Sequence, residues 1–186
     1  MVERLIRGFR TPGLLLGLLL LPSPALAHRL DEYLQATLVA IEPSQVRLQI
    51  NLTPGVEVAD KVLMHIDRDG DGTISPLEAW DYCELLKCDL ILRLDGSKVP
   101  LKLSASNFPA PSELRTGWGI VQLEFSAPIG PLAAGAHKLT LKNRHLPRIS
   151  VYLFNAAPPA SPLIQISAQK RNRNQSSGEI RFGVER

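Results

Sequence analysis

The sequence predicts a mainly β fold with inserted helices, an immunoglobulin-like β-sandwich that carries a helix–loop–helix insertion at about residues 56–86. Apolar and polar residues alternate with a period of two along most of the chain, as in strands with one buried face. Turns rich in proline and glycine interrupt this alternation at short intervals, which is typical of β-sandwiches. Residues 56–86 show helical spacing instead. We therefore expect one sandwich domain over residues 28–186.

The first two strands are predicted to form a hairpin. The first runs from Leu34 to Ala40 and the second from Val46 to Leu52, with Glu42-Pro43-Ser44 between them. In the first strand the apolar residues that alternate with Gln35 and Thr37 are expected to form the buried face. They are Leu34, Ala36, Leu38 and Ala40.

Helical spacing starts after this hairpin, stops before residue 67 and resumes after residue 78. The apolar residues at helical spacing are Val58, Val62 and Ile66 in the first segment and Trp80, Cys83 and Leu86 in the second. Helix, loop and helix are therefore expected in that order, between the second and third strands.

The remaining strands are separated by breaks such as Asp95-Gly96, a strong turn signal, and Pro158 to Pro162. They bring the expected total to about nine short strands. The predicted segments are Cys88 to Leu94, Lys98 to Ala105, Ile120 to Phe125, His137 to Leu141, Ile149 to Phe154, Leu163 to Ala168 and Glu179 to Val184.

Between the two predicted helices, residues 67–78 have the sequence D-R-D-G-D-G-T-I-S-P-L-E, which fills the positions of an EF-hand calcium loop. Calcium takes about six to eight oxygen ligands, and such a loop supplies them from alternate positions. The predicted ligands are Asp67, Asp69, Asp71, the backbone carbonyl of Thr73, Ser75 and both carboxylate oxygens of Glu78. Gly72 stands where the loop must turn sharply.

The same segment carries a helix-start signal. Ser75 is the predicted N-cap, Pro76 stands at the first helical position, and Glu78, three residues after the cap, completes a capping box. The alternative is an acidic, glycine-rich surface turn without a ligand. No second loop of this kind occurs in the sequence, so the sandwich is expected to brace this one.

Residues 1–27 are interpreted as a signal peptide. Arg4, Arg7 and Arg10 precede the apolar run Leu14 to Leu21, and Ala25-Leu26-Ala27 forms a cleavage site. The alternative, an uncleaved anchor, requires about 20 apolar residues. Since no later stretch is long or apolar enough to span a bilayer, we expect an exported, periplasmic or secreted protein that is soluble after cleavage.

Export makes a disulfide between Cys83 and Cys88 the expected state of the two cysteines. Along a continuous helix their separation would be about 7.5 Å in rise alone, beyond the limit of about 7 Å for a bridge. The prediction therefore requires the helix to end before Cys88. The alternative is two half-buried thiols.

Several short motifs resemble the exported N-terminal domain of HupE/UreJ-like bacterial membrane proteins. They are L-D-E-Y-L-Q-A-T at Leu30 to Thr37 after His28, N-L-T-P-G-V at Asn51 to Val56, the D-x-D-G-D-G loop, N-R-H at Asn143 to His145 and V-Y-L at Val151 to Leu153. In that family such a domain is commonly followed by a membrane-spanning part linked to metal transport. The resemblance therefore implies an accessory or interaction module with a membrane-protein partner.

These observations favour a non-catalytic, calcium-binding extracytoplasmic domain. The alternative is an exported copper-binding protein in which His28, the expected mature N-terminus, binds the metal with His137 or His145. Known hydrolase and nucleotide-binding motifs are absent from the sequence, so we do not expect an enzyme. The formal net charge of +3 falls mostly on the predicted signal peptide, which gives no reason to expect nucleic-acid binding.

Overall fold

The computed structural model describes residues 31–185. The predicted signal peptide, its cleavage site and His28 lie outside these residues. The elements, in chain order, are β1 (Tyr33–Ile41), β2 (Gln45–Pro54), α1 (Ala59–Ile66), α2 (Pro76–Asp89), β3 (Leu90–Leu94), β4 (Ser97–Lys98), β5 (Lys102–Asn107), α3 (Pro111–Arg115), β6 (Val121–Pro128), β7 (Gly135–Asn143), β8 (Ser150–Ala156), β9 (Ile164–Arg171) and β10 (Ser177–Val184).

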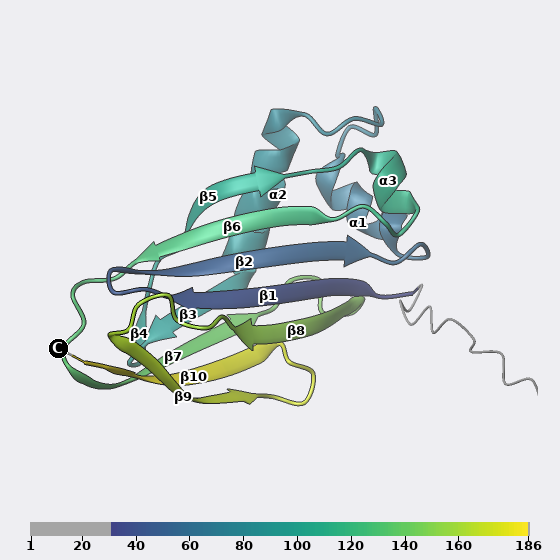
Figure 1. Ribbon diagram of the computed structural model, residues 1–186. Helices are drawn as coiled ribbons and strands as arrows, with labels where there is room; N and C mark the ends of the chain where they lie inside the picture. Colours follow the sequence, from purple (N-terminus) through teal and green to yellow (C-terminus); the bar gives the residue numbers. More distant parts are fainter. Residues whose placement is uncertain (1–30, 186) are drawn as a thin grey trace, which may run out of the picture.

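Within this part of the chain the fold is mainly β, with two five-stranded sheets (Figure 1). One sheet has the order β5-β6-β2-β1-β8 and the other β4-β3-β7-β10-β9. The pair β1–β8 is parallel, whereas β1–β2, β2–β6 and β7–β10 are antiparallel. Buried side chains of both sheets, such as Leu48, Phe125, Leu141 and Phe182, belong to one hydrophobic core. This arrangement is consistent with a β-sandwich.

The two longer helices lie between β2 and β3 in the chain. In Figure 1, α1 lies beside α3 near the end of β2, and α2 crosses behind β5 and β6 towards β3. Val58, Val62 and Ile66 are buried, as their helical spacing predicts. In α2 the prediction is only partly right, because Cys83 and Leu86 are buried but Trp80 is 54% exposed. Tyr82, which is fully buried, takes the inward position instead.

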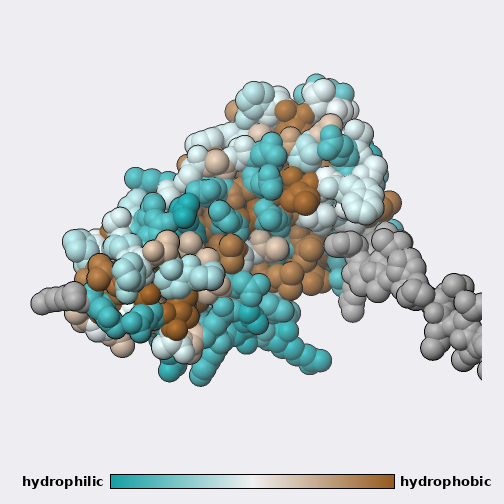
Figure 2. Space-filling view, in the orientation of Figure 1, coloured by the Kyte–Doolittle hydropathy of each residue, from teal (hydrophilic) through white to brown (hydrophobic). Residues whose placement is uncertain are grey.

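β1 buries the opposite face from the one predicted. Its inward residues are Tyr33, Gln35, Thr37, Val39 and Ile41, while the smaller, more apolar row Leu34, Ala36, Leu38 and Ala40 is turned outward and partly exposed. Figure 2 shows apolar patches among polar ones on the surface seen in that view. Burying Gln35 is tolerated because its amide is hydrogen-bonded on both sides, as described below.

The predicted strand Lys98 to Ala105 is wrong as a single element. The structure divides it into β4, in one sheet, and β5, in the other. Pro100 lies between them, and a proline cannot donate a backbone hydrogen bond within a ladder. The described residues therefore contain ten strands. The short helix α3 was not predicted either, although Pro111 occupies a first-turn position that favours a helix start.

The predicted disulfide is also wrong. Helix α2 continues to Asp89, so Cys83 and Cys88 lie on one helix, about 7.5 Å apart in rise. This separation exceeds the limit of about 7 Å for a bridge, and the structure has both as free thiols. Cys83 is buried and Cys88 is exposed.

Within residues 31–185 no helix has the length and hydropathy that crossing a bilayer requires.

Candidate metal centre

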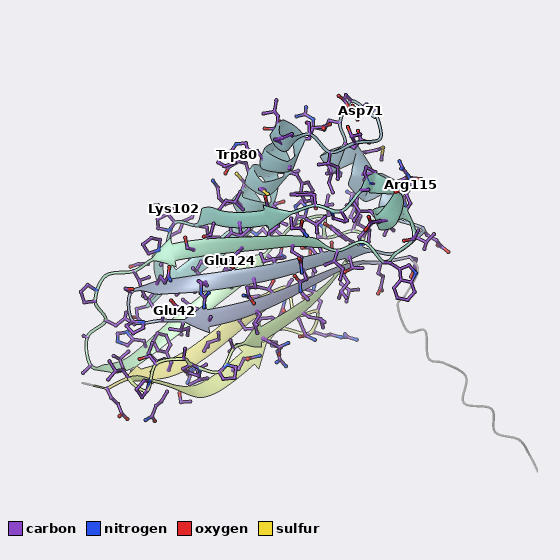
Figure 3. All side chains as sticks on the ribbon, turned by 45° about the horizontal axis from the view of Figure 1, so that its top comes forward. Glu42, Asp71, Trp80, Lys102, Arg115 and Glu124 are labelled. Carbon is purple, nitrogen blue, oxygen red and sulfur yellow. The ribbon has the colours of Figure 1, made fainter. Side chains whose placement is uncertain are left out.

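The loop between α1 and α2 is closed by capping interactions at both ends. At the first end, the backbone N–H of Asp67 donates to the carbonyl of Leu63 over 2.8 Å. At the second, Ser75 caps α2 in a complete capping box with Glu78, and Pro76 follows the cap. The predicted helix start is therefore confirmed. Figure 3 labels Asp71 in this loop, at the outer end of the helical region.

Three of the predicted ligands come together in this loop. One oxygen each from Asp67, Asp69 and Asp71 can be chosen so that all lie within 4.8 Å of one another. Asp67 is buried, with 7% of its surface exposed, whereas the other two carboxylates are exposed. Gly72 has a φ of +84°, as expected at the sharp turn.

Backbone N–H groups of the loop point to these carboxylates. Gly72 donates to Oδ2 of Asp67 over 3.1 Å, and Asp71 donates to Oδ1 of Asp69 over 3.2 Å. Thr73 donates to Oδ1 of Asp71 from both its backbone N–H and its hydroxyl, over 2.8 and 2.7 Å. The turn is therefore built around the acidic side chains, which limits their freedom to move apart.

The remaining oxygen of Asp67 is the unusual atom of the loop. Oδ1 is buried and has no hydrogen-bond partner among residues 31–185. A buried carboxylate oxygen without a partner loses its hydration and gains nothing in return. A hard cation between the three carboxylates would compensate for this loss, so the donor set fits a metal ion.

Glu78 occupies a different place from the three aspartates. Its Oε1 accepts from the N–H of Arg68 over 2.7 Å, and its Oε2 accepts from the N–H and the hydroxyl of Ser75 over 2.9 and 2.7 Å. These bonds, those from Ser75 first, lower the pKa of Glu78 to about 2. The carboxylate is thus ionised and closes the base of the loop.

The structure therefore gathers some of the six predicted ligands and not all of them. Glu78 is outside the group formed by the three aspartates, and the hydroxyl of Ser75 is engaged with Glu78. Coordination by Glu78 would require its oxygens to exchange N–H donors for the ion. Ile74 packs against the hydrophobic core, as expected for the apolar residue of such a loop.

The two described histidines of the copper alternative are already hydrogen-bonded through both ring nitrogens. His137 contacts Oδ2 of Asp95 at 2.7 Å and the carbonyl of Ala133 at 2.9 Å. His145 is fully buried and contacts Asp89 and Tyr82. Neither ring presents a free nitrogen to a metal in this conformation.

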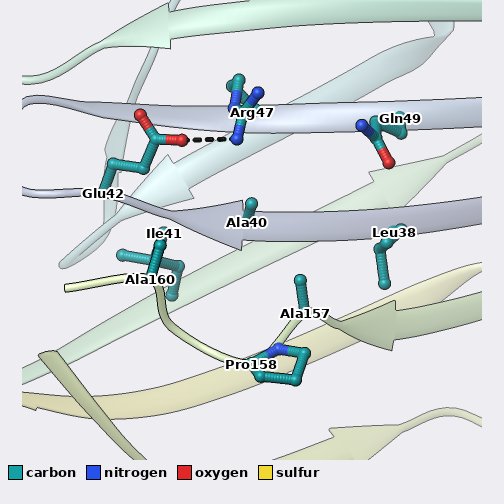
Figure 4. Close-up of a pocket in the computed structure, with 9 residues that line it drawn as sticks. All are labelled: Leu38, Ala40, Ile41, Glu42, Arg47, Gln49, Ala157, Pro158 and Ala160. Atoms are coloured by element: carbon teal, nitrogen blue, oxygen red, sulfur yellow. Dashed lines mark ion pairs between the residues drawn. The ribbon is translucent and has the colours of Figure 1, made fainter. Parts of the chain in front are cut away.

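A pocket of about 150 Å³ lies beside β1 and β2, against residues 157–160 (Figure 4). Its polar lining includes Glu42, Arg47 and Gln49, and Arg47 pairs with Glu42 over 2.7 Å. Because Glu42 balances the charge of Arg47, this pair offers a ligand less net charge than the three carboxylates of the aspartate loop do.

No protein-family model matches the chain, and the search of curated proteins gives no match either. The function is therefore argued from the residues of the chain.

Proposed function

We propose that this protein is a non-catalytic calcium-binding domain that acts outside the cytoplasm, with a single EF-hand loop inserted in a β-sandwich. The observation that carries this proposal is the buried, unpartnered Oδ1 of Asp67 beside the carboxylates of Asp69 and Asp71. A cation placed there would satisfy the orphaned oxygen and reduce the repulsion between the carboxylates.

Calcium fits this donor set better than other biological cations. The predicted ligands, Asp67, Asp69, Asp71, Thr73, Ser75 and Glu78, offer only oxygen atoms, whereas copper and zinc favour imidazole and thiolate ligands. Magnesium demands near-ideal octahedral geometry and gives up water reluctantly. A loop with several carboxylates suits the larger and less demanding calcium ion.

We expect weak binding. A dissociation constant of about 10⁻⁴–10⁻³ M is typical of extracellular modules, and Glu78 must exchange existing hydrogen bonds for the ion. Such an affinity suits a compartment in which calcium is abundant. The signal-like N-terminus and the resemblance to HupE/UreJ-like proteins support a role as an accessory module of a membrane or metal-transport system, with a membrane-protein partner.

Calorimetric titration of the purified protein with calcium, magnesium and copper tests this proposal. The wild-type protein and Glu57→Gln, which removes an exposed charge outside the loop, should bind calcium alike. Asp67→Asn, which removes the charge of the buried ligand, should weaken binding at least tenfold, about 1.4 kcal/mol. Equal calcium affinity in Asp67→Asn and wild type, or binding of copper in preference to calcium, would contradict the proposal.

A further inference from the structure

A chain of buried hydrogen bonds joins α2 to the first sheet. The hydroxyl of Tyr33, on β1, lies 2.5 Å from that of Tyr82, on α2. The hydroxyl of Tyr82 lies 3.0 Å from Nε2 of His145, and Nδ1 of His145 lies 2.8 Å from Oδ2 of Asp89, the last residue of α2. Tyr33, Tyr82 and His145 have no exposed surface. We call these four residues the tyrosine–histidine chain.

The sandwich holds His145 firmly in place through its backbone. Its carbonyl accepts from Nε2 of Gln35 and from the hydroxyl of Tyr152, each over 2.9 Å. Its N–H donates to Oδ1 of Asn143 over 2.8 Å. The side-chain amide of Asn143 in turn donates from Nδ2 to Oε1 of Gln35, also over 2.8 Å. Three of the short sequence motifs described above meet at this point. They contribute Tyr33 and Gln35, Asn143 and His145, and Tyr152, respectively.

The direction of the hydrogen bonds favours a neutral His145. With a proton on Nδ1, the ring donates to Asp89 and accepts at Nε2 from Tyr82, which then accepts from Tyr33. A second proton on Nε2 would reverse both tyrosine hydroxyls. Tyr33 would then have to donate elsewhere, and among the described residues its hydroxyl has Tyr82 as its hydrogen-bond partner. Burial also lowers the pKa of His145, although Asp89 partly offsets this effect.

Helix α2 contributes Tyr82 and Asp89 to the tyrosine–histidine chain and also carries Glu78, the last predicted ligand of the calcium loop. Glu78 and Tyr82 are separated by one helical turn and are both buried, so they lie on the same face of α2. The tyrosine–histidine chain fixes that face against Tyr33 of β1. A change in the docking of α2 would therefore move Glu78 and Ser75 relative to the three aspartates.

We propose that the tyrosine–histidine chain couples calcium binding to the protonation of His145, so that acidification releases calcium. This inference rests on the proposed calcium site. Protonation disrupts the chain and loosens α2, which weakens calcium binding. By linkage, bound calcium lowers the pKa of His145 to the same extent.

The titratable groups that face His145 come from several elements. They are Tyr33 on β1, Tyr82 and Asp89 on α2, Tyr152 on β8 and, at longer range, His65 on α1. Burial raises the pKa of all three tyrosines, so they stay neutral between pH 5.5 and 7.5. His65 also acts electrostatically on His145, so its effect must be separated from that of His145 by experiment.

Calcium titrations at pH 7.5 and 5.5 distinguish the effect of His145 from that of His65. They compare wild type, His145→Gln and the control His137→Gln. Since all three proteins keep His65 and the loop carboxylates, these groups affect them equally. Beyond that common effect, we expect wild type and His137→Gln to lose calcium affinity about fivefold at pH 5.5, the lower end of typical coupling factors. His145→Gln should show only the common effect.

A histidine titration by NMR tests the coupling in the wild-type protein, so its result does not depend on the folding of His145→Gln. Saturating calcium should lower the His145 pKa by about 0.7, which corresponds to the same fivefold factor. Tyr82→Phe keeps the ring but breaks the chain, so it should abolish most of this change. A change that persists in Tyr82→Phe would reflect the charge of the ion alone and would overturn the proposed route.

The two proposals fail in different ways. Absence of binding heat with calcium at pH 7.5 refutes the calcium site and, with it, the coupling. Calcium binding at pH 7.5 with an unchanged His145 pKa, or with equal pH dependence in wild type and His145→Gln, refutes the coupling and leaves the calcium site standing.

Discussion

Removing calcium should leave the two sheets folded and loosen mainly residues 56–86. The core side chains Leu48, Phe125, Leu141 and Phe182 are buried and belong to strands outside this segment. The loop itself has little core to lose, because Asp69 and Asp71 are exposed. Without an ion, however, three carboxylates stay close together and Oδ1 of Asp67 stays unpartnered.

The size of the effect follows from ligand linkage. At a calcium concentration ten times the dissociation constant, binding adds about 1.4 kcal/mol to the free energy of unfolding. For a domain of this size, about 1 kcal/mol raises the Tm by about 2–4 °C. The expected rise in Tm is therefore about 3–6 °C in millimolar calcium.

Thermal unfolding followed by circular dichroism, with calcium or with a chelator, measures this shift. Asp67→Asn should respond much less than wild type, which distinguishes the site from a general effect of salt. Hydrogen exchange should show increased amide protection in calcium mainly within residues 56–86. Complete loss of the β-sheet signal on chelation would refute this reasoning, because the ion would then organise the whole domain.

Three further predictions concern packing, thiol chemistry and pH. Gly178→Ala should destabilise the protein by about 1–3 kcal/mol in urea unfolding, because an added Cβ would overlap the buried ring of Phe154. Cys88 should be alkylated in the folded protein well before Cys83, as mass analysis would show, because burial raises the Cys83 pKa to about 11. Because burial lowers the pKa of His145 in the folded state, its contribution to stability should be complete above about pH 6.5 and be lost as the pH falls towards the folded pKa, as urea midpoints at several pH values would show.

Each of these predictions has a matched control or a contrary result. Gly130→Ala adds the same methyl group where no atom lies within 4 Å, so it should change stability little. Equal alkylation rates at the two thiols, or failure of either to react before reduction, would contradict the free and unequal cysteines. In His145→Gln, the fall in stability between pH 6.5 and 5.5 should be smaller than in wild type.

Local patterns predicted the elements well where one physical signal dominates. Alternation located most strands, and in β2 the predicted apolar residues Val46, Leu48, Ile50 and Leu52 are indeed the buried ones. The helix start at Ser75 was also predictable, because a capping box involves only residues within one turn. The grouping of the aspartates follows equally from short spacing within a single loop.

Alternation alone could not choose the buried face of β1. Leu34, Ala36, Leu38 and Ala40 form the more apolar row, yet Tyr33, Gln35, Thr37, Val39 and Ile41 are inward. Gln35 is buried because partners more than 100 residues away in the chain bind its amide. A hydropathy pattern treats such a residue as polar and outward, since it contains no information on distant partners.

The sequence by itself determined the strand-rich pattern, the insertion of two helices and the acidic loop with its capped exit, because each depends on residues close together in the chain. Only the tertiary structure decided that α2 continues past Cys88, that Tyr82 rather than Trp80 faces inward, and that Asp67 buries one oxygen. It also brought Tyr33, Tyr82 and His145 together across separations of 49 and 63 residues. The physical reason is that burial and long-range hydrogen bonding depend on which surfaces meet when the sheets and helices pack.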